Sequence, residues 1–378
     1  MTMAPGPARS VGRRVALRVV LLLASTGIGL ALLEVGLRVT RPVALRVHGD
    51  RIVLPRNATL RIPAASSPDG EALVEIRNSL GFRGPEPPAD FDRSLTIVAI
   101  GGSTTECFFL PDGETWPERL GELLAESLRD VWVANAGLDG HSTHGHLVLL
   151  EQGVLPLDPR VVLFLAGAND VANPSLNRFD RSALRSEDDL DLLTRAARHS
   201  HAAALFQNLL RDRQARELDH GHRRIDLAAS PTRDLSEAER SRRVREMTEP
   251  FLAGYEANVR RLVRSCLDAG VLPVLVTQPA LFGPAIDDAT GVDLSRVEVG
   301  DDDGASRWTV LEAYNDVTRR VGREEGALVV DLARTMPKSS RFFYDFYHFS
   351  RDGAREVARR VEAELAPHLR ERFPEFER

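Results

Sequence analysis

The stretch "VAIGGSTTEC", residues 98–107, passes from an apolar run directly into two glycines and a serine. The run begins at residue 95 as "LTIVAI", and apolar residues without polar alternation are typical of a strand buried on both faces of a parallel sheet. Glycine permits a close backbone approach and unusual dihedral angles. The stretch therefore predicts a buried strand that ends in a tight turn and leaves the hydroxyl of Ser103 at the edge of the sheet.

Four further apolar runs follow toward the C-terminus. They are "VWVANA" at 131–136, "VVLFLAG" at 161–167, "VLPVLVT" at 271–277 and "ALVVDLA" at 327–333. Amphipathic helical stretches separate them, at 114–128, 144–155, 251–270 and 308–326. Apolar strands that alternate with helices predict an α/β protein, with a five-stranded parallel sheet between two helical layers.

The N-terminus carries a candidate membrane-spanning helix. Residues 19–33 carry no charge and follow four arginines, Arg9, Arg13, Arg14 and Arg18. A helix from Val15 to Leu37 would be about 35 Å long, against roughly 30 Å of bilayer hydrocarbon. No Ala-x-Ala cleavage motif is evident after the run, which favours an uncleaved signal anchor in the cell membrane, with a single pass and the large domain outside the cytoplasm. A cleaved signal peptide, which would give a secreted protein, and a buried core helix are the alternatives.

The sequence divides into three parts. Residues 1–40 form the predicted anchor, and residues 41–92, rich in Pro, Gly and Arg, form a juxtamembrane accessory segment. The α/β domain occupies 93–378, with a polar insertion at about 171–250 in which we expect helices at 201–215 and 236–251.

Charge and cysteine content exclude several classes of protein. The net charge is −6, and acidic and basic residues alternate along most of the chain, which argues against a nucleic-acid partner. The two cysteines, Cys107 and Cys266, fit neither a disulfide framework nor a clustered zinc site. We expect both to be small buried residues, and a single disulfide bond stays open if the domain is exported.

Polar residues follow four of the five predicted strands. They are "GGST" at 101–104, "NAGLDGHST" at 135–143, "GAND" at 167–170 and "YDFYHFS" at 344–350. The carboxyl ends of parallel strands share one edge of the sheet, where ligands bind. We therefore expect these four loops to form one site.

The residue types in these loops suit nucleophilic catalysis. A serine hydroxyl needs a base to take its proton and donors to stabilise the oxyanion that forms. His348 is the candidate base, because Asp345 lies three residues before it and a carboxylate at that distance can orient an imidazole. The amide of Asn169 and the N–H of Gly140 are candidate oxyanion donors. A phosphate-binding loop is disfavoured, since neither the Walker lysine nor the G-x-G-x-x-G spacing is present, and the lipase motif G-x-S-x-G is absent too.

Taken in order, these four blocks resemble those of the SGNH hydrolases, also called the GDSL family, over about residues 93–366. The resemblance implies a flavodoxin-like fold and a Ser-His-Asp catalytic triad of Ser103, His348 and Asp345. It also implies an oxyanion hole formed by the backbone N–H groups of Ser103 and Gly140 and by the amide of Asn169. The segment "NSLGFRGPE" at 78–86 resembles membrane-anchored bacterial members. Gly102 departs from the Gly-Asp-Ser of the family name, which argues against the plant-type lipase branch.

Histidines near the second block allow another interpretation. His141, His144 and His146 with Asp139 have spacings at which imidazoles can bind zinc, but residues in that loop would equally line a substrate pocket. We expect no metal and no cofactor, and we assign His141 and Asp170 to the substrate pocket. We expect the aromatic residues between 342 and 349 to form core and pocket wall.

The sequence thus predicts a serine ester hydrolase that acts on acyl esters, acetyl esters among them, through an acyl-enzyme intermediate. The expected substrate is a small-molecule or glycan ester. One alternative is an O-acyltransferase that modifies envelope polysaccharide, and another is a catalytically silent binding or scaffold protein with the same fold. The oligomeric state stays open.

Overall fold

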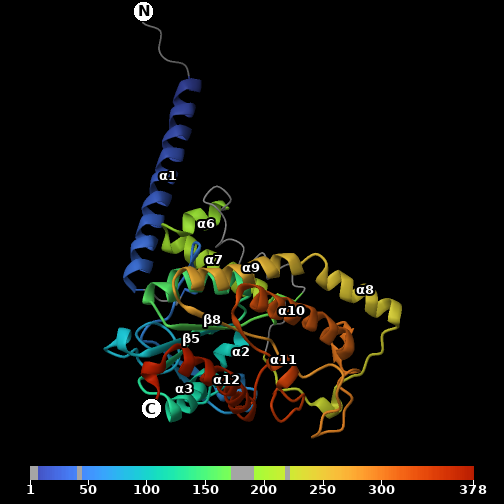
Figure 1. Cartoon of the computed structure of the whole chain (residues 1–378). Coiled ribbons are helices and arrows are strands. Elements are labelled where there is room, and N and C mark those ends of the chain that lie inside the picture. The colour runs from blue at the N-terminus through green and yellow to red at the C-terminus, as the bar shows by residue number, and fades with distance from the viewer. Residues whose placement is uncertain (1–6, 41–44, 172–190, 218–221) are drawn as a thin grey trace, which may run out of the picture.

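A five-stranded parallel sheet forms the centre of the molecule. The computed structural model describes residues 7–40, 45–171, 191–217 and 222–378 (Figure 1). The strands of the sheet are β5 (Leu95–Gly101), β6 (Val131–Asn135), β7 (Val161–Leu165), β8 (Leu272–Val276) and β11 (Leu328–Val330). Their spatial order is β11-β8-β7-β5-β6. The five predicted strands and their parallel arrangement are confirmed.

Helices cover both faces of this sheet, as Figure 1 shows. On one face α3 (Trp116–Ser127) packs against α12 (Arg351–Arg372). On the other lie α4 (Thr143–Leu149), α9 (Leu252–Asp268) and α10 (Gly304–Glu325). Two short helices, α2 (Ser103–Glu106) and α11 (Leu332–Thr335), follow β5 and β11 directly. The chain therefore has the expected three-layer α/β/α fold.

The strand from which the sequence argument began lies in the interior of the sheet. All seven residues of β5 are buried, and β5 hydrogen-bonds to β6 on one side and to β7 on the other. This explains why the run is apolar at every position, since both faces of the strand are covered. Ser103 follows β5 and so leaves the sheet one strand from its β6 edge.

The segment before the sheet folds into two small antiparallel hairpins. One joins β1 (Val47–His48) to β2 (Arg51–Ile52), and the other joins β3 (Thr59–Ile62) to β4 (Leu73–Ile76). After β4, the backbone of Arg83 exchanges hydrogen bonds of 2.9 and 3.0 Å with that of Asn135, the last residue of β6. The segment thus reaches the edge strand of the sheet close to its carboxyl end.

The polar insertion contains three described helices, α6 (Leu192–Ala197), α7 (His201–Glu217) and α8 (Glu237–Thr248). The helices expected at 201–215 and 236–251 are confirmed. The remainder of the insertion includes residues 172–190 and 218–221, which lie outside the described residues. A further small hairpin, β9 (Glu298–Val299) with β10 (Asp302–Asp303), precedes α10.

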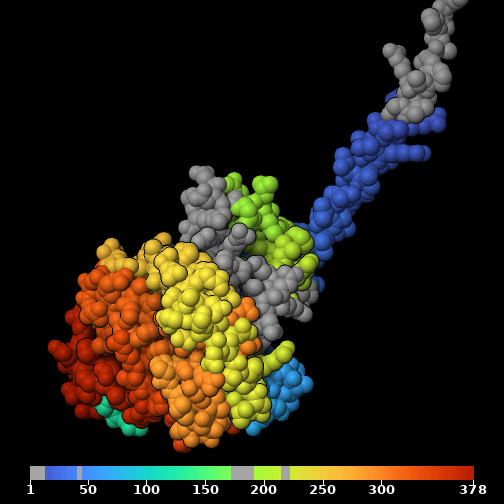
Figure 2. All heavy atoms as spheres, turned by 90° about the vertical axis from the view of Figure 1, so that its right-hand side faces the viewer, coloured from blue at the N-terminus to red at the C-terminus, as the bar shows by residue number. Residues whose placement is uncertain are grey.

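The N-terminal helix α1 (Pro7–Thr40) stands away from the rest of the molecule (Figure 2). Within the described ranges, one helix is long and apolar enough to cross a membrane, Arg13–Thr40, and none of its most apolar window is buried. Its composition is the one expected for a signal anchor or a signal sequence.

Both cysteines are free and buried. The thiol of Cys107 contacts the carbonyl oxygen of Thr104 at 3.4 Å. Burial raises the pKa of both thiols to about 12, so both stay protonated at neutral pH. The prediction that they are small buried residues is confirmed.

Candidate active site

Three side chains from opposite ends of the α/β domain form a hydrogen-bonded chain. Nε2 of His348 lies 2.7 Å from Oγ of Ser103, and Nδ1 lies 2.7 Å from Oδ2 of Asp345. Ser103 opens α2 and is 7% exposed. The structure thus brings together the three residues named from the sequence, in the order hydroxyl, imidazole, carboxylate.

Asp345 is held in place by its own loop. Its Oδ1 accepts hydrogen bonds from the backbone N–H groups of Tyr347, at 2.8 Å, and of His348, at 2.7 Å. Burial on its own would raise the pKa of Asp345, but the hydrogen bonds from His348 and Tyr347 and the charge of the imidazole hold that pKa below its ordinary value. The carboxylate therefore stays ionised and fixes the orientation of the ring.

The two glycines before Ser103 are required by close packing. A Cβ atom on Gly101 would lie 2.1 Å from Oγ1 of Thr105, and one on Gly102 would lie 2.5 Å from Nδ2 of Asn169. Neither distance is compatible with a side chain. The amide of Asn169 therefore lies against the residue that precedes the serine, and a side chain at 102 would displace it.

The candidate oxyanion donors come from two neighbouring loops. Nδ2 of Asn169 donates to the carbonyl oxygen of His141 at 3.0 Å, and the amide carries a second N–H. Gly140 precedes His141 and has a φ of +75°, a left-handed conformation that favours glycine. The bond to His141 therefore joins the loop of Asn169 to that of Gly140.

A buried carboxylate, that of Glu106, joins the loop of Gly140 to the helix of Ser103. The carboxylate of Glu106, the last residue of α2, accepts from the backbone N–H of Asp139 and pairs with the guanidinium of Arg77. Glu106 and Arg77 are 4% and 3% exposed. In addition, Nδ2 of Asn135 donates to the carbonyl oxygen of Thr105 at 2.7 Å. These contacts fix the second loop relative to the serine.

Arg83 binds the C-terminal end of the same helix and the turn that follows it, and it is completely buried. Its guanidinium donates to the carbonyl oxygens of Glu106, Cys107 and Leu110 at 2.8–2.9 Å, and to Oδ1 of Asp112 at 2.9 Å. The turn that carries it is closed by Asn78, whose Oδ1 accepts from the N–H of Phe82 at 3.1 Å. Sequence reasoning noted "NSLGFRGPE" only as a resemblance, and did not predict that it binds the turn after the serine.

His222, from the insertion, is a residue that sequence reasoning missed. Its ring centroid lies 4.0 Å from that of His348, with 38° between the ring planes. Its Nδ1 is 2.9 Å from Oη of Tyr344, and its Nε2 is 3.4 Å from Oδ1 of Asp139. Burial would lower the pKa of His222, but Asp139, with a smaller contribution from Asp345, raises that pKa above its ordinary value. A second, readily protonated imidazole therefore lies against the candidate base.

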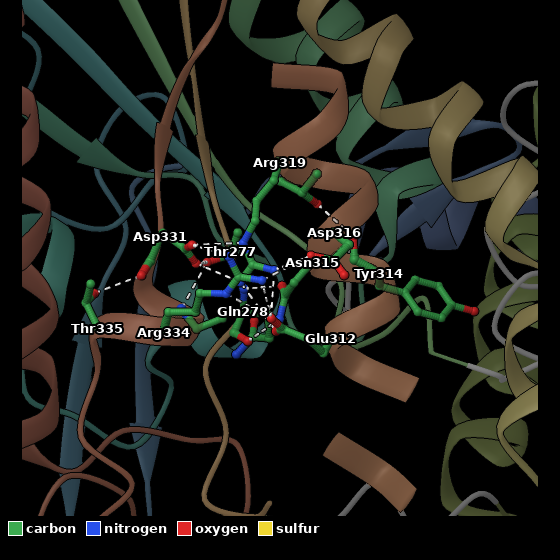
Figure 3. A network of polar contacts seen from close by, with 12 residues as sticks. Thr277, Gln278, Glu312, Tyr314, Asn315, Asp316, Arg319, Asp331, Arg334 and Thr335 are labelled. Carbon is green, nitrogen blue, oxygen red and sulfur yellow. Dashed lines mark hydrogen bonds and ion pairs between the residues drawn. The ribbon is translucent and has the colours of Figure 1, made fainter. Parts of the chain in front are cut away.

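The fourth strand also contributes to the site, through a polar network shown in Figure 3. Oγ1 of Thr104, next to the serine, donates to Oε1 of Gln278 at 3.2 Å. The backbone of Gln278 is held by the side chain of Asn315 through bonds of 2.8 and 3.1 Å. One turn further along α10, Arg319 pairs with Asp331 at the end of β11 at 2.8 Å. The sequence offered no signal for Gln278, because the loop after β8 lacks the glycine-rich pattern of the others.

His141 and Asp170 take up different positions. The carbonyl oxygen of His141 is the acceptor for Asn169, at 3.0 Å. Asp170 is 5% exposed and accepts from the N–H and hydroxyl of Thr143, at 3.1 and 2.6 Å. Asp170 and His144 line a small cavity of about 50 Å³. The assignment of His141 and Asp170 to a substrate pocket stays a prediction.

The alternative zinc site does not assemble among the residues that the structure describes. Among those residues, His222, Asp345 and His348 are the ones that place three ligand atoms within 4.8 Å of one another. This group contains none of the predicted residues Asp139, His141, His144 and His146. Burial lowers the pKa of His146 to about 3, which keeps that imidazole neutral. In this group, Nδ1 and Nε2 of His348 each take part in a hydrogen bond, with Asp345 and Ser103 respectively. A metal ion bound by His348 would have to replace one of these two hydrogen bonds.

The aromatic residues after β11 form both core and pocket wall. Phe343 and Phe349 are 3% and 2% exposed. The ring of Tyr344 is stacked on His348, with centroids 5.5 Å apart and 12° between the planes. Tyr344 also lines a cavity of about 500 Å³ together with residues 224–227 of the insertion. The expected double role of this cluster is confirmed.

One family of known proteins matches most of the α/β domain. The model of the GDSL-like Lipase/Acylhydrolase family matches residues 99–356, which include Ser103, Asn169 and His348. A comparison with curated proteins finds no match.

Solved structures with a similar fold include two bacterial enzymes. One is a lipase/acylhydrolase from Enterococcus faecalis, 16% identical, for which the match covers 72% of this chain and 96% of that chain with a TM-score of 0.39. Another is Axe2, an acetylxylan esterase from Geobacillus stearothermophilus, also 16% identical, with 72% and 94% covered and a TM-score of 0.41. The assignment rests on the family model, which spans more than half of the sequence. The chain belongs to the GDSL-like lipase/acylhydrolase family and is a hydrolase that acts on ester bonds.

Proposed function

We propose that this protein hydrolyses acyl esters with Ser103 as nucleophile, His348 as general base and Asp345 as the group that orients the base. The observation that carries the proposal is the 2.7 Å separation of His348 Nε2 from Ser103 Oγ, with Asp345 at 2.7 Å on the other ring nitrogen. The first distance lies within the reach required for proton transfer, and the second is that of a hydrogen bond that orients the ring. The substrate is a small-molecule or glycan ester, acetyl esters included.

The reaction proceeds in two steps. Ser103 Oγ attacks the ester carbonyl while its proton passes to Nε2 of His348, and the N–H groups of Ser103, Gly140 and Asn169 stabilise the oxyanion. The C–O bond of the ester then breaks, and the alcohol leaves with the proton from His348. A water molecule gives a proton to His348 and attacks the acyl-enzyme. The free acid departs, and the proton returns to Ser103.

Removal of the hydroxyl tests this mechanism. Ser103→Ala should lower kcat on p-nitrophenyl acetate by a factor on the order of 10⁶, to the background rate. Ser241→Ala, on helix α8, is the matched control and should leave the rate unchanged. A Ser103→Ala protein that keeps most of its activity would show that another group attacks the ester.

We propose further that α1 is retained as an uncleaved anchor and that the catalytic domain lies outside the cytoplasm. Two contacts between α1 and residues 199–201, at the start of α7, support retention: Arg38 donates to the carbonyl oxygen of His199 at 2.8 Å, and Glu34 accepts from the N–H of His201 at 2.8 Å. Mass spectrometry of the protein extracted from membranes should give the molecular mass of a chain that still contains residues 1–40. A mature chain that begins beyond residue 40 would establish cleavage instead.

A further inference from the structure

The insertion exposes apolar side chains on two adjoining helices. Leu192 of α6 is 84% exposed, and Phe206, Leu209 and Leu210 of α7 are 54%, 58% and 44% exposed. Positions 206, 209 and 210 have the i, i+3, i+4 spacing that places residues on one face of a helix. We call these four residues the α6–α7 surface. Soluble surfaces seldom group large apolar side chains in this way, and such groups mark contact sites.

A different face of α7 holds the chain that follows the N-terminal helix. Gln207, 6% exposed, donates to the carbonyl oxygen of Gly49 at 3.0 Å. The side chain of Asn208 accepts from the N–H of Arg46 at 2.8 Å and donates to the carbonyl oxygen of Val47 at 2.7 Å. Helix α7 is therefore fixed to the segment that leaves α1, while the side chains of the α6–α7 surface stay exposed among the residues that the structure describes.

The beginning of α7 is fixed at the end of the apolar stretch of α1. That stretch ends at Leu33, and the next residue, Glu34, accepts from the hydroxyl of Ser200 at 2.8 Å and from the N–H groups of His201 and Ala202 at 2.8 and 3.1 Å. A carboxylate at the N-terminus of a helix is also favoured by the helix dipole. Figures 1 and 2 both show α6 and α7 at the base of α1.

This position relates the α6–α7 surface to a bilayer. If α1 spans the membrane, its last uncharged turn lies at the level where hydrocarbon gives way to headgroups, and Glu34 lies at that boundary. The start of α7 then lies at the same depth. Apolar side chains on a helix at this depth enter the boundary between headgroups and acyl chains.

We infer that the α6–α7 surface docks onto the phospholipid bilayer that α1 spans, and so holds the catalytic domain against the membrane. The inference rests on the proposed anchoring by α1 and adds a second, peripheral contact to it. His222, whose ring lies against that of His348, belongs to the same insertion and follows α7 in the sequence.

Fluorescence of the full chain in phosphatidylcholine and phosphatidylglycerol vesicles tests the inference. An environment-sensitive thiol dye is attached to Leu209→Cys and, as the matched control, to Ile286→Cys. Both native residues are apolar, and their exposed fractions are 58% and 60%. The native cysteines are 8% and 0% exposed and should not react. Ile28→Cys, in the middle of α1, reports separately on anchoring.

Spin-labelled lipids should quench the dye at 209 several-fold more strongly than the dye at 286, and its emission should shift to shorter wavelength. Quenching at 28 without excess quenching at 209 over 286 would overturn the docking and leave the anchor intact. Absence of quenching at both 28 and 209 would overturn both proposals. Excess quenching at 209 without quenching at 28 would support the docking and contradict the span.

Discussion

Close contacts between side chains around Ser103 determine how substitutions at this site affect activity. The amide of Asn169 occupies the place of a side chain at Gly102, and the imidazole of His348 has a hydrogen-bond partner on each ring nitrogen. A second ring, that of His222, lies on its face. Each of these contacts leads to a measurable expectation.

Gly102→Ala should displace the amide of Asn169. The new Cβ would lie 2.5 Å from Nδ2, so the amide must move away from the serine. Loss of one oxyanion donor typically lowers the rate by about 10²–10³, and we expect a decrease of that size in kcat on p-nitrophenyl acetate. Gly254→Ala is the control, since no atom lies within 4 Å of its Cβ position in helix α9. Equal activity of the two variants would show that Asn169 is not a donor.

His222→Gln should change the pH profile of hydrolysis. Asp139 raises the pKa of His222, so the wild-type ring is a cation below that raised value. A cation on the face of His348 disfavours the second positive charge that forms when His348 takes the serine proton. Activity should therefore rise with pH through the pKa of His222. The acid limb of kcat/KM depends on the protonation of both rings in the wild type and on that of His348 alone in His222→Gln, so it should be less steep in the variant. The exposed His368→Gln is the control, and an acid limb of unchanged steepness in His222→Gln would remove His222 from the mechanism.

The sequence identified Ser103, Asp345 and His348 because each lies in a short motif whose residue types already suggest a role. His222 lies in no such motif. Its importance comes from the fold of an insertion over the site, and its ring meets that of a residue far along the chain. Gln278 was missed for the same reason, since only the packing of β8 beside β7 brings it to Thr104.

At the scale of elements, the unit formed by β5 and α2 depends on a segment that precedes the sheet. The turn after α2 presents three carbonyl oxygens to one buried guanidinium, that of Arg83. Apolar runs predicted the strands well, because burial on both faces leaves a continuous apolar pattern. The contacts of residues 75–83 with α2 were not predictable, because a charged residue in a proline-rich segment normally lies in solvent.

Arg83→Met should destabilise the fold and disorder the turn after α2. It leaves the three carbonyl oxygens and the carboxylate of Asp112 without their buried cation, and it leaves Glu75 with Arg77 as its cation. Removal of one partner from a buried charged network costs about 3–5 kcal/mol. Chemical denaturation should show a decrease of this size in the free energy of unfolding. Arg355→Ala, at an exposed ion pair with Asp352 on α12, should change it by less than about 1 kcal/mol. Similar values for the two variants would contradict the role given to Arg83.

At the scale of the whole molecule, the insertion contacts both the N-terminal helix α1 and the candidate active site at the carboxyl end of the sheet. It contacts α1 through Glu34 and Arg38, and it reaches His348 through His222. The sequence predicted an anchor, an α/β domain and a helical insertion, since each has its own composition. Composition does not predict how such parts contact one another. The position of the α6–α7 surface beside α1 was therefore visible only in the structure.

The stability of the whole fold should fall in acid. Burial on its own would raise the pKa values of Asp303, Asp331 and Asp345, but hydrogen bonds, from Arg240, Arg319 and His348 respectively, hold all three below the ordinary value. The unfolded chain therefore binds more protons than the folded one as pH falls below the aspartate pKa of about 3.9. Stability is fully present above that pH and is lost as pH falls toward the folded pKa values. Thermal denaturation should show a decreasing Tm over this range, and a constant Tm would contradict the assignment of these carboxylates.

Peptide mapping of a fluorophosphonate adduct by mass spectrometry tests the role of Ser103 most directly. The reagent reacts with an activated serine next to a base and oxyanion donors. We predict a single adduct on Ser103 in the wild-type chain, strongly reduced labelling in His348→Ala and none in Ser103→Ala. An adduct on another residue, or undiminished labelling of Ser103→Ala, would contradict the assignment of Ser103 as the nucleophile.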